Sequence, residues 1–277
     1  MSQEKKIAIV FSGQSRFALQ GASQVIQYIK SAEGIQPDIF FHTWNLEDEN
    51  IFPAWVNPQY LVFVDPKCLT EKLKPKRYLI ETQDMLPQLN LIDICRTDAN
   101  PKSILSMFYS MHKADNLRQN YEREFGFKYD LVFRSRFDFF PIGRLPIVDA
   151  KSNACYFPDL LRNQLAFCDW FFWGNSDSMS GAQNVMQKLQ ELIDLKIPVC
   201  GEDLLLANLQ IENIQPIKVK CSGYLIRDVN HRNLDFGRVL LADAKLLFLQ
   251  YRFKNIVSRA KAYLKSFSNE NDNERRS

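Results

Sequence analysis

The stretch Tyr129–Asp138, with the sequence YDLVFRSRFD, joins a short apolar run to three charged side chains. The apolar run at 131–133 is typical of a strand that is covered on both faces. Arg134, Arg136 and Asp138 follow at every second position, so they would share one face of an extended chain. Charges at a buried strand end are unfavourable unless they are paired or bind a ligand, and open α/β sheets bind ligands at that edge. We therefore predict a central strand whose end forms the active-site edge. For any one of these residues, an ion pair that only closes the strand is the alternative.

The composition is that of an ordinary globular protein. The 277 residues are 46% hydrophobic and 13% aromatic, which is enough for one large α/β domain or two small ones. A net charge of +3 does not indicate a general nucleic-acid binder. The six cysteines form no CxxC pair and no metal-ligand spacing, which favours reduced thiols. No apolar stretch reaches the ~18 residues that cross a bilayer. The sequence thus predicts a cytoplasmic protein that is not integral to a membrane.

Near the N-terminus the pattern predicts a strand, a turn and a helix. The run KIAIVF at 6–11 is strand-like, SGQSR at 12–16 breaks it, and 17–29 continue with helical spacing. Gly13 would let backbone amides approach a ligand, and Arg16 could donate two hydrogen bonds to a phosphate near the helix start. The turn matches neither common glycine-rich nucleotide motif, so a plain turn with a surface arginine is the alternative.

A second strand also ends in polar side chains. The run PDIFF at 37–41 predicts this strand, and His42 and Trp44 follow it directly. A base or ribose would fit there, and a core tryptophan beside a hydrogen-bonded histidine is the alternative. Further strands are predicted at 60–64 and 77–80.

The longest predicted helix is Ser103–Phe125, because apolar residues recur at spacings of three and four and Gly126 stands at a C-terminal cap position. It leads into the 129–138 strand. A loop is expected from Asp138 to Pro146. The remaining predicted elements are strands at 154–157, 214–219 and 224–226, one helix from 175 or 176 to 193, and one from 201 to 209.

Two carboxylates in the second half are candidates for chemistry. Asp169 lies in the run FCDWFFWG at 167–174, where it is either hydrogen-bonded in the core or an acid or base with a raised pKa. Glu202 and Asp203 lie in the first turn of a predicted helix. Stabilisation by the helix dipole is the simpler explanation for that pair.

The segment HKADNLRQNYEREFGFKYDLVFRSRFD at 112–138 resembles a pattern of GT-A-type glycosyltransferases, most of all those of bacterial capsule and lipopolysaccharide synthesis. In the pattern A..sD.lRy..Ly..GG.Y.D.D, the first D and the R match Asp115 and Arg118, one glycine matches Gly126, and the last acid of DxD matches Asp138. Arg136 stands where the first acid of that DxD would be. The resemblance implies an α/β fold with a mixed, mainly parallel sheet flanked by helices.

The same resemblance implies a nucleotide-sugar donor at the strand ends. The donor-binding residues would be Gly13, Gln14, Arg16, His42, Asp115, Arg118, Arg134, Arg136 and Asp138. Asp138 and His231 would hold a divalent cation, Mn²⁺ or Mg²⁺, although the arginine at 136 departs from the usual metal site. Glu202 corresponds to the acid of an xED-like motif.

The chemistry of glycosyl transfer sets two requirements. The departing pyrophosphate needs charge stabilisation from a cation or from arginines, and an inverting enzyme needs a carboxylate to take the proton from the acceptor hydroxyl. Glu202 is preferred over Asp169 as that base, because a helix start keeps it ionised while aromatic burial favours a protonated Asp169. The expected function is inverting transfer of a sugar to a glycan or lipid-linked acceptor in surface polysaccharide synthesis. The alternative is a non-catalytic nucleotide- or carbohydrate-binding module on the same fold.

Three parts are expected along the chain: a catalytic domain at 1–240, a basic amphipathic helix at 241–267 and a disordered tail at 268–277. Between Lys245 and Phe267 apolar residues line one face, six basic residues lie off it, and Asp and Glu are absent. Such a helix can lie on the anionic inner face of a membrane and bring the enzyme to a lipid-linked acceptor. Docking of its apolar face on the catalytic domain or on a second subunit, as in a homo-oligomer, is the alternative.

Overall fold

The computed structural model describes residues 5–45, 63–86, 100–146, 150–159 and 167–226. They belong to one compact unit, Met1–Asp228. Most of the predicted strand at 60–64 lies outside the described residues, as do His231, the predicted helix at 241–267 and the tail at 268–277. Among the described residues, no helix is long and apolar enough to cross a membrane.

In the first half of the chain the described helices and strands alternate, as in an α/β protein, and in the second half they follow one another in runs of strands and of helices. In order they are β1 (Ile7–Ser12), α1 (Ala18–Glu33), β2 (Asp38–Trp44), α2 (Pro66–Leu73), β3 (Arg77–Glu81), the 3-10 helix η2 (Gln83–Met85), α3 (Pro101–Phe125), β4 (Leu131–Ser135), β5 (Phe139–Ile142), β6 (Ala154–Pro158), β7 (Phe171–Gly174), α4 (Ser176–Ala182), α5 (Leu189–Asp194), α6 (Gly201–Ile211), β8 (Gln215–Val219) and β9 (Ser222–Leu225).

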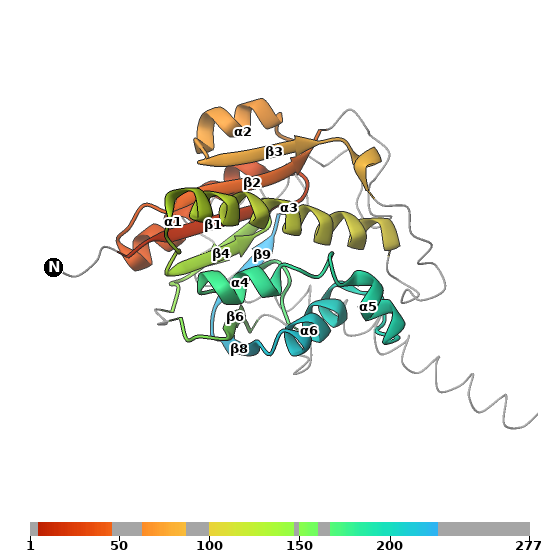
Figure 1. The fold of residues 1–277 in the computed structure, drawn as a ribbon. Helices are drawn as coiled ribbons and strands as arrows, with labels where there is room; N and C mark the ends of the chain where they lie inside the picture. Colours follow the sequence, from red (N-terminus) through yellow and green to blue (C-terminus); the bar gives the residue numbers. More distant parts are fainter. Residues whose placement is uncertain (1–4, 46–62, 87–99, 147–149, 160–166, 227–277) are drawn as a thin grey trace, which may run out of the picture. The chain divides into compact units, whose positions relative to one another are not determined.

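Seven strands form one mixed, mainly parallel sheet in the order β3-β2-β1-β4-β7-β6-β8 (Figure 1). The four strands β3, β2, β1 and β4 are parallel, and β7 is antiparallel to both of its neighbours. The predicted α/β class with a mixed, mainly parallel sheet is therefore confirmed. The predicted central position of the strand in 129–138 is confirmed too, because β4 is the middle strand of the seven.

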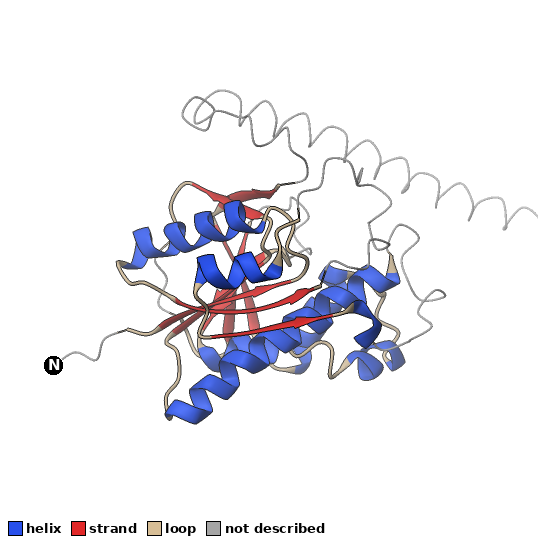
Figure 2. Ribbon diagram, turned by 90° about the horizontal axis from the view of Figure 1, so that it is seen from above, coloured by secondary structure: helices blue, strands red, loops and turns tan. Residues whose placement is uncertain are grey.

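Helices cover both faces of this sheet, as the view in Figure 2 shows. The apolar side chains of β1 contribute to the hydrophobic cores on both faces of the sheet. Ala8 and Val10 pack in the core formed with α3, α4, α5 and α6. Ile7, Ile9 and Phe11 pack in the core formed with α1 and α2. This alternation explains why the strand is apolar throughout.

Two predicted elements differ from the structure. The expected loop after Asp138 is instead β5, which pairs antiparallel with β9 in a second, two-stranded sheet. Pro141 made this segment look like a loop, but proline is tolerated in an edge strand. The single helix expected up to 193 is two helices, α4 and α5, because the chain turns after α4, where the buried Gln183 side chain donates to Asp115 Oδ1 at 3.0 Å.

Candidate functional site at the switch point of the sheet

The carboxyl ends of β1 and β4 lie side by side where the strand order reverses. From β1 the chain moves outward to β2 and β3, and α3 then returns it to β4 on the other side of β1. Open α/β sheets bind ligands outside the carboxyl ends of their strands at such a switch point. Because β7 runs antiparallel to β4, it begins at this same edge, with Ser135 opposite Phe171.

Three predicted residues meet at this point. Asp138 accepts two hydrogen bonds from Arg136, from Nε to Oδ1 and from Nη2 to Oδ2, both at 2.8 Å, and Arg16 Nη2 lies 3.3 Å from Asp138 Oδ2. Burial lowers the pKa of Arg16 to about 10, although Asp138 partly opposes this effect. Arg16 Nε, which is buried, has no hydrogen-bond partner among the described residues. A desolvated guanidinium with a free N–H favours an anionic ligand. We call Arg16, Arg136 and Asp138 the switch-point cluster.

Arg134 lies deeper than the switch-point cluster. It is 1% exposed, and burial lowers its pKa to about 10. Its Nε donates to Ser12 Oγ at 3.3 Å and its Nη1 donates to the carbonyl oxygen of Asp169. Arg134 therefore joins the end of β1 to the start of β7. These bonds favour a positioning role over the predicted contact with the donor.

The two candidate acids also lie close together at this edge. Gly201 at the start of α6 is so near Asp169 that an added Cβ would stand 2.8 Å from Asp169 Oδ2. The pKa of Asp169 is raised by burial and by the charge of Glu202, against the opposing charges of Arg134 and Arg136. This direction agrees with the expectation that Asp169 is protonated among the aromatic side chains.

The turn after β1 is fixed from both sides. Gly13 has a φ of 112°, which favours glycine, and an added Cβ would meet nothing within 4 Å, so the turn borders open space. Its N–H donates to Ser110 Oγ at 2.7 Å, and its carbonyl accepts from Thr43 Oγ1 at 2.9 Å. The Gly13 amide is thus bonded within the protein, and the predicted approach of backbone amides to a ligand at this turn stays a prediction. Gln14, also predicted to bind the donor, lies in the same turn.

His42 is fully buried in β2. Its Nδ1 lies 2.8 Å from Ser110 Oγ and its Nε2 lies 2.9 Å from Glu81 Oε2, while Trp44 packs edge-on at a centroid distance of 4.8 Å. Both ring nitrogens are thus engaged inside the protein. The structure agrees with the alternative of a hydrogen-bonded core histidine beside a tryptophan and places no free nitrogen toward a donor.

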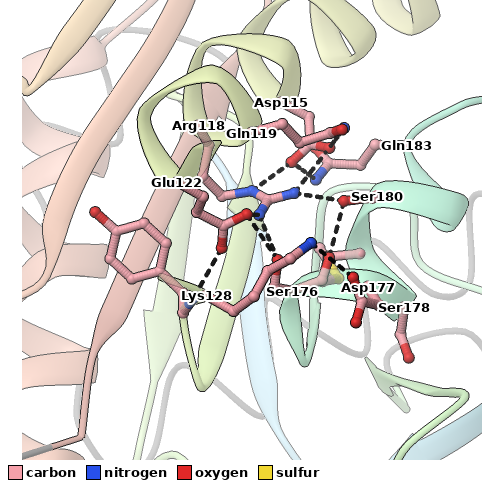
Figure 3. Close-up of polar contacts among 12 residues, drawn as sticks. Asp115, Arg118, Gln119, Glu122, Lys128, Ser176, Asp177, Ser178, Ser180 and Gln183 are labelled. Carbon is pink, nitrogen blue, oxygen red and sulfur yellow. Dashed lines mark hydrogen bonds and ion pairs between the residues drawn. The ribbon is translucent and has the colours of Figure 1, made fainter. Parts of the chain in front are cut away.

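Asp115 and Arg118, predicted to bind the donor, lie between α3 and α4 instead (Figure 3). Both side chains are buried. The Arg118 guanidinium donates to both oxygens of Asp115 at 2.7 and 3.1 Å, and to Glu122, Ser176 and Ser180 at 2.7 Å each. Every one of these partners is a protein group, so the arrangement supports a structural role that joins the two helices.

Asp138 is already paired with two guanidinium groups, so a divalent cation bound to it in this arrangement would be repelled by the positive charges of Arg16 and Arg136. Within the described ranges, no group of three or more His, Cys, Asp and Glu side chains is placed to hold a metal ion. The other predicted ligand, His231, lies outside these ranges.

Sequence reasoning missed the polar residues that support the edge. Ser110, Thr43 and Glu81 come from α3, β2 and β3, and each binds a residue at a strand end. The available signal was Ser110 itself, a hydroxyl between the apolar residues of the first part of a long helix. Its partner could not be identified without the packing of α3 on β1 and β2.

Comparisons with known proteins give similarity at the level of structure alone. No protein-family model matches the chain, and a search of curated proteins returned no match. A solved structure of a glycosyltransferase involved in the glycosylation of the major capsid of PBCV-1 is similar, with a TM-score of 0.38 and 10% sequence identity over 78% of this chain and 82% of that one. The apo-form glycosyltransferase GlyE of Streptococcus pneumoniae TIGR4 has a TM-score of 0.40 and 13% identity over 77% of this chain and 45% of GlyE, so the chain matches less than half of that protein. With both TM-scores below 0.5, neither similarity supports a conclusion about activity.

Proposed function

We propose that the chain is a glycosyltransferase of the GT-A-like kind, which transfers a sugar from a nucleotide-sugar donor to a hydroxyl of a glycan or lipid-linked acceptor, with inversion. The observation that carries the proposal is the position of the switch-point cluster. The Arg16 guanidinium and the Asp138 carboxylate are buried at the edge where sheets of this class bind ligands, the Arg136 guanidinium lies partly exposed beside them, and Arg16 has an unused donor there.

In the proposed reaction, the bond between the anomeric carbon and the diphosphate oxygen breaks as the acceptor oxygen attacks from the opposite side. Negative charge develops on the departing diphosphate, and Arg16 and Arg136 supply preorganised positive charge for it. Asp138 orients both arginines through its two oxygens. No step is assigned to a metal ion.

The proton of the acceptor hydroxyl must pass to a base. Glu202 is that base in our proposal, since it lies in the first turn of α6, where the helix dipole favours an ionised carboxylate. Burial and the charge of Glu202 raise the pKa of Asp169 beside it, which makes Asp169 the less suitable base.

The test is a panel of nucleotide sugars, with release of nucleotide measured with and without glycan acceptors. Arg136→Ala and Asp138→Asn should each lower turnover at least ~100-fold, the scale for loss of a preorganised charge from a transition state. Arg144→Ala removes an exposed arginine just after β5 and is the matched control. Near-normal turnover in either cluster variant contradicts the proposal. Undiminished turnover in excess chelator would show that the arginines suffice without a metal.

A second candidate is a module that binds a nucleotide or a carbohydrate without catalysis. One observation favours it: Arg136 replaces the first acid of the DxD pattern and bonds to the remaining acid. Calorimetry with the same nucleotides separates the two candidates. Binding without turnover of any donor identifies the module.

A further inference from the structure

We propose that Ser110, His42 and Glu81 form a directed chain of hydrogen bonds that holds the Gly13 turn in place, which makes His42 a positioning residue in one defined tautomer. The chain begins at the turn after β1 and crosses α3 and β2 to reach β3. As a statement about donor binding, the inference rests on the function proposed above. As a statement about the turn itself, it is independent of that function.

The geometry leaves one consistent placement of the protons. Glu81 accepts from His42, and this hydrogen bond lowers the pKa of Glu81, so its carboxylate is ionised and can only accept. His42 Nε2 must therefore carry a hydrogen. Burial lowers the pKa of His42, against the opposing effect of Glu81, so the imidazole is neutral and its Nδ1 is an acceptor.

Ser110 fits the remaining requirement. Its oxygen accepts the N–H of Gly13 at 2.7 Å, and its own hydrogen is then free for His42 Nδ1 at 2.8 Å. The other acceptor near that hydroxyl among the described residues is the carbonyl of His42, at a longer 3.4 Å. The direction of donation thus runs from Gly13 to Ser110 to His42 to Glu81, and every polar atom in the chain has a partner.

Further groups around His42 support this arrangement. Lys113 Nζ lies 3.8 Å from Glu81 Oε1 on the side away from the imidazole contact, which keeps the carboxylate ionised. Tyr109 packs against the His42 ring at 5.9 Å and against Trp44 at 5.4 Å, so the ring cannot rotate freely. On the other side of the turn, Thr43 binds the Gly13 carbonyl. The turn that precedes Arg16 is therefore fixed at both its N–H and its C=O.

Two substitutions of His42 test its contact with Ser110 and its contact with Glu81 separately. Asn places a polar atom near the position of Nδ1 and keeps the contact with Ser110, whereas Gln reaches the position of Nε2 and keeps the contact with Glu81. Both remove the ring, so a purely structural effect of the imidazole would be similar in both. The proposal requires that His42→Asn preserve the Gly13 turn and that His42→Gln disturb it.

The measurement is hydrogen exchange of the Gly13 amide in the full chain, which needs no ligand. Ser110→Ala and His42→Gln should each speed this exchange about tenfold relative to the amides of β1, the equivalent of one lost hydrogen bond. His42→Asn and the matched control Ser106→Ala, a buried serine one turn earlier on α3, should leave it unchanged within about threefold. Equal exchange in the Asn and Gln variants overturns the proposal.

Nitrogen NMR of the wild-type imidazole gives a second, independent readout. It should show the neutral tautomer with hydrogen on Nε2 at pH 7, and hydrogen on Nδ1 would also overturn the proposal. Affinity for a panel of nucleoside diphosphates then tests the link to the donor site. Binding should be about tenfold weaker than in the wild type for Ser110→Ala and for His42→Gln, and unchanged for His42→Asn and Ser106→Ala. If wild-type protein binds no nucleotide while exchange and NMR behave as stated, the proposed function fails and the positioning chain stands.

Discussion

Replacement of Arg118 by methionine should destabilise the protein strongly without altering the switch-point cluster. Methionine fills much of the same volume but removes all five hydrogen bonds of the guanidinium, two of them to the oxygens of Asp115 and one to Glu122 (Figure 3). Two buried carboxylates then face each other without a cation. Loss of one partner from a buried ion pair costs about 3–5 kcal/mol, a large part of the ~5–15 kcal/mol that stabilises a typical domain. Urea unfolding followed by circular dichroism measures this free energy directly.

The matched control neutralises the whole group at once. Asp115→Asn/Arg118→Met/Glu122→Gln leaves no unpaired charge, so it should be more stable than Arg118→Met alone. Where Arg118→Met is still folded, its nucleotide affinity should equal that of the wild type. A loss of stability below about 1 kcal/mol, or a triple variant less stable than the single one, would refute the account of the buried ion network. Lost nucleotide affinity in a folded Arg118→Met variant would restore the donor-binding prediction.

Three further outcomes are expected. Gly21→Ala should lower the free energy of unfolding by ~1–3 kcal/mol and should also lower turnover. An added Cβ would overlap the carbonyl of Phe137 and stand 3.0 Å from the carbonyl of Phe139, on the backbone segment that carries Asp138. Ser23→Ala on the exposed side of α1 is the control. Glu202→Gln should lower kcat in a transfer assay with little change in donor affinity, and a collapse of donor affinity at unchanged kcat would make Asp169 the better base. Asp169→Asn should become more stable relative to the wild type as the pH rises above about 3.9, the usual pKa of an aspartate in an unfolded chain. The raised pKa of Asp169 in the folded protein disfavours ionisation, so the wild type loses stability above that pH and the asparagine variant does not. Free energies of unfolding that change in parallel for the two proteins over pH 4–8 would contradict this expectation.

The fold could be predicted from local pattern wherever an element carries its own signal. We could predict β1 and β4 from their apolar runs, and α3 from its long periodicity, to within a few residues. A covered strand and an amphipathic helix each have a pattern that can be recognised within a short stretch of sequence. β5 could not be predicted in this way. Its partner β9 lies some eighty residues further along the chain, and pairing between such distant segments produces no recognisable pattern in the residues of β5 itself.

For the candidate site, the sequence indicated the edge of the sheet where it lies, but not which groups each charged side chain bonds to. The alternation of Arg136 and Asp138 placed charge at the end of the central strand, and the structure has them bonded to each other. Arg118 and Asp115 share the same residue types and were given the same role, yet their helix turns them toward α4. Residue type and spacing cannot separate a ligand-binding arginine from a structural one, because only tertiary packing decides which carboxylate each guanidinium meets.

Charge balance explains how the RFD sequence at 136–138 serves the proposed reaction where a DxD pair would need a cation. Two carboxylates with one divalent cation are electrically neutral, and so is the pair of Arg136 with Asp138, to which Arg16 adds one positive charge. Arg16 and Arg136 with the single carboxylate of Asp138 leave one net positive charge, and Arg16, with a pKa of about 10, stays protonated at neutral pH. If Arg136 stands where the resemblance implies an acid, the exchange would remove one negative charge and add one positive charge, the same change of two units that binding a divalent cation would bring. Because the guanidinium groups are covalently fixed and oriented by Asp138, they are preorganised for a diphosphate before it arrives.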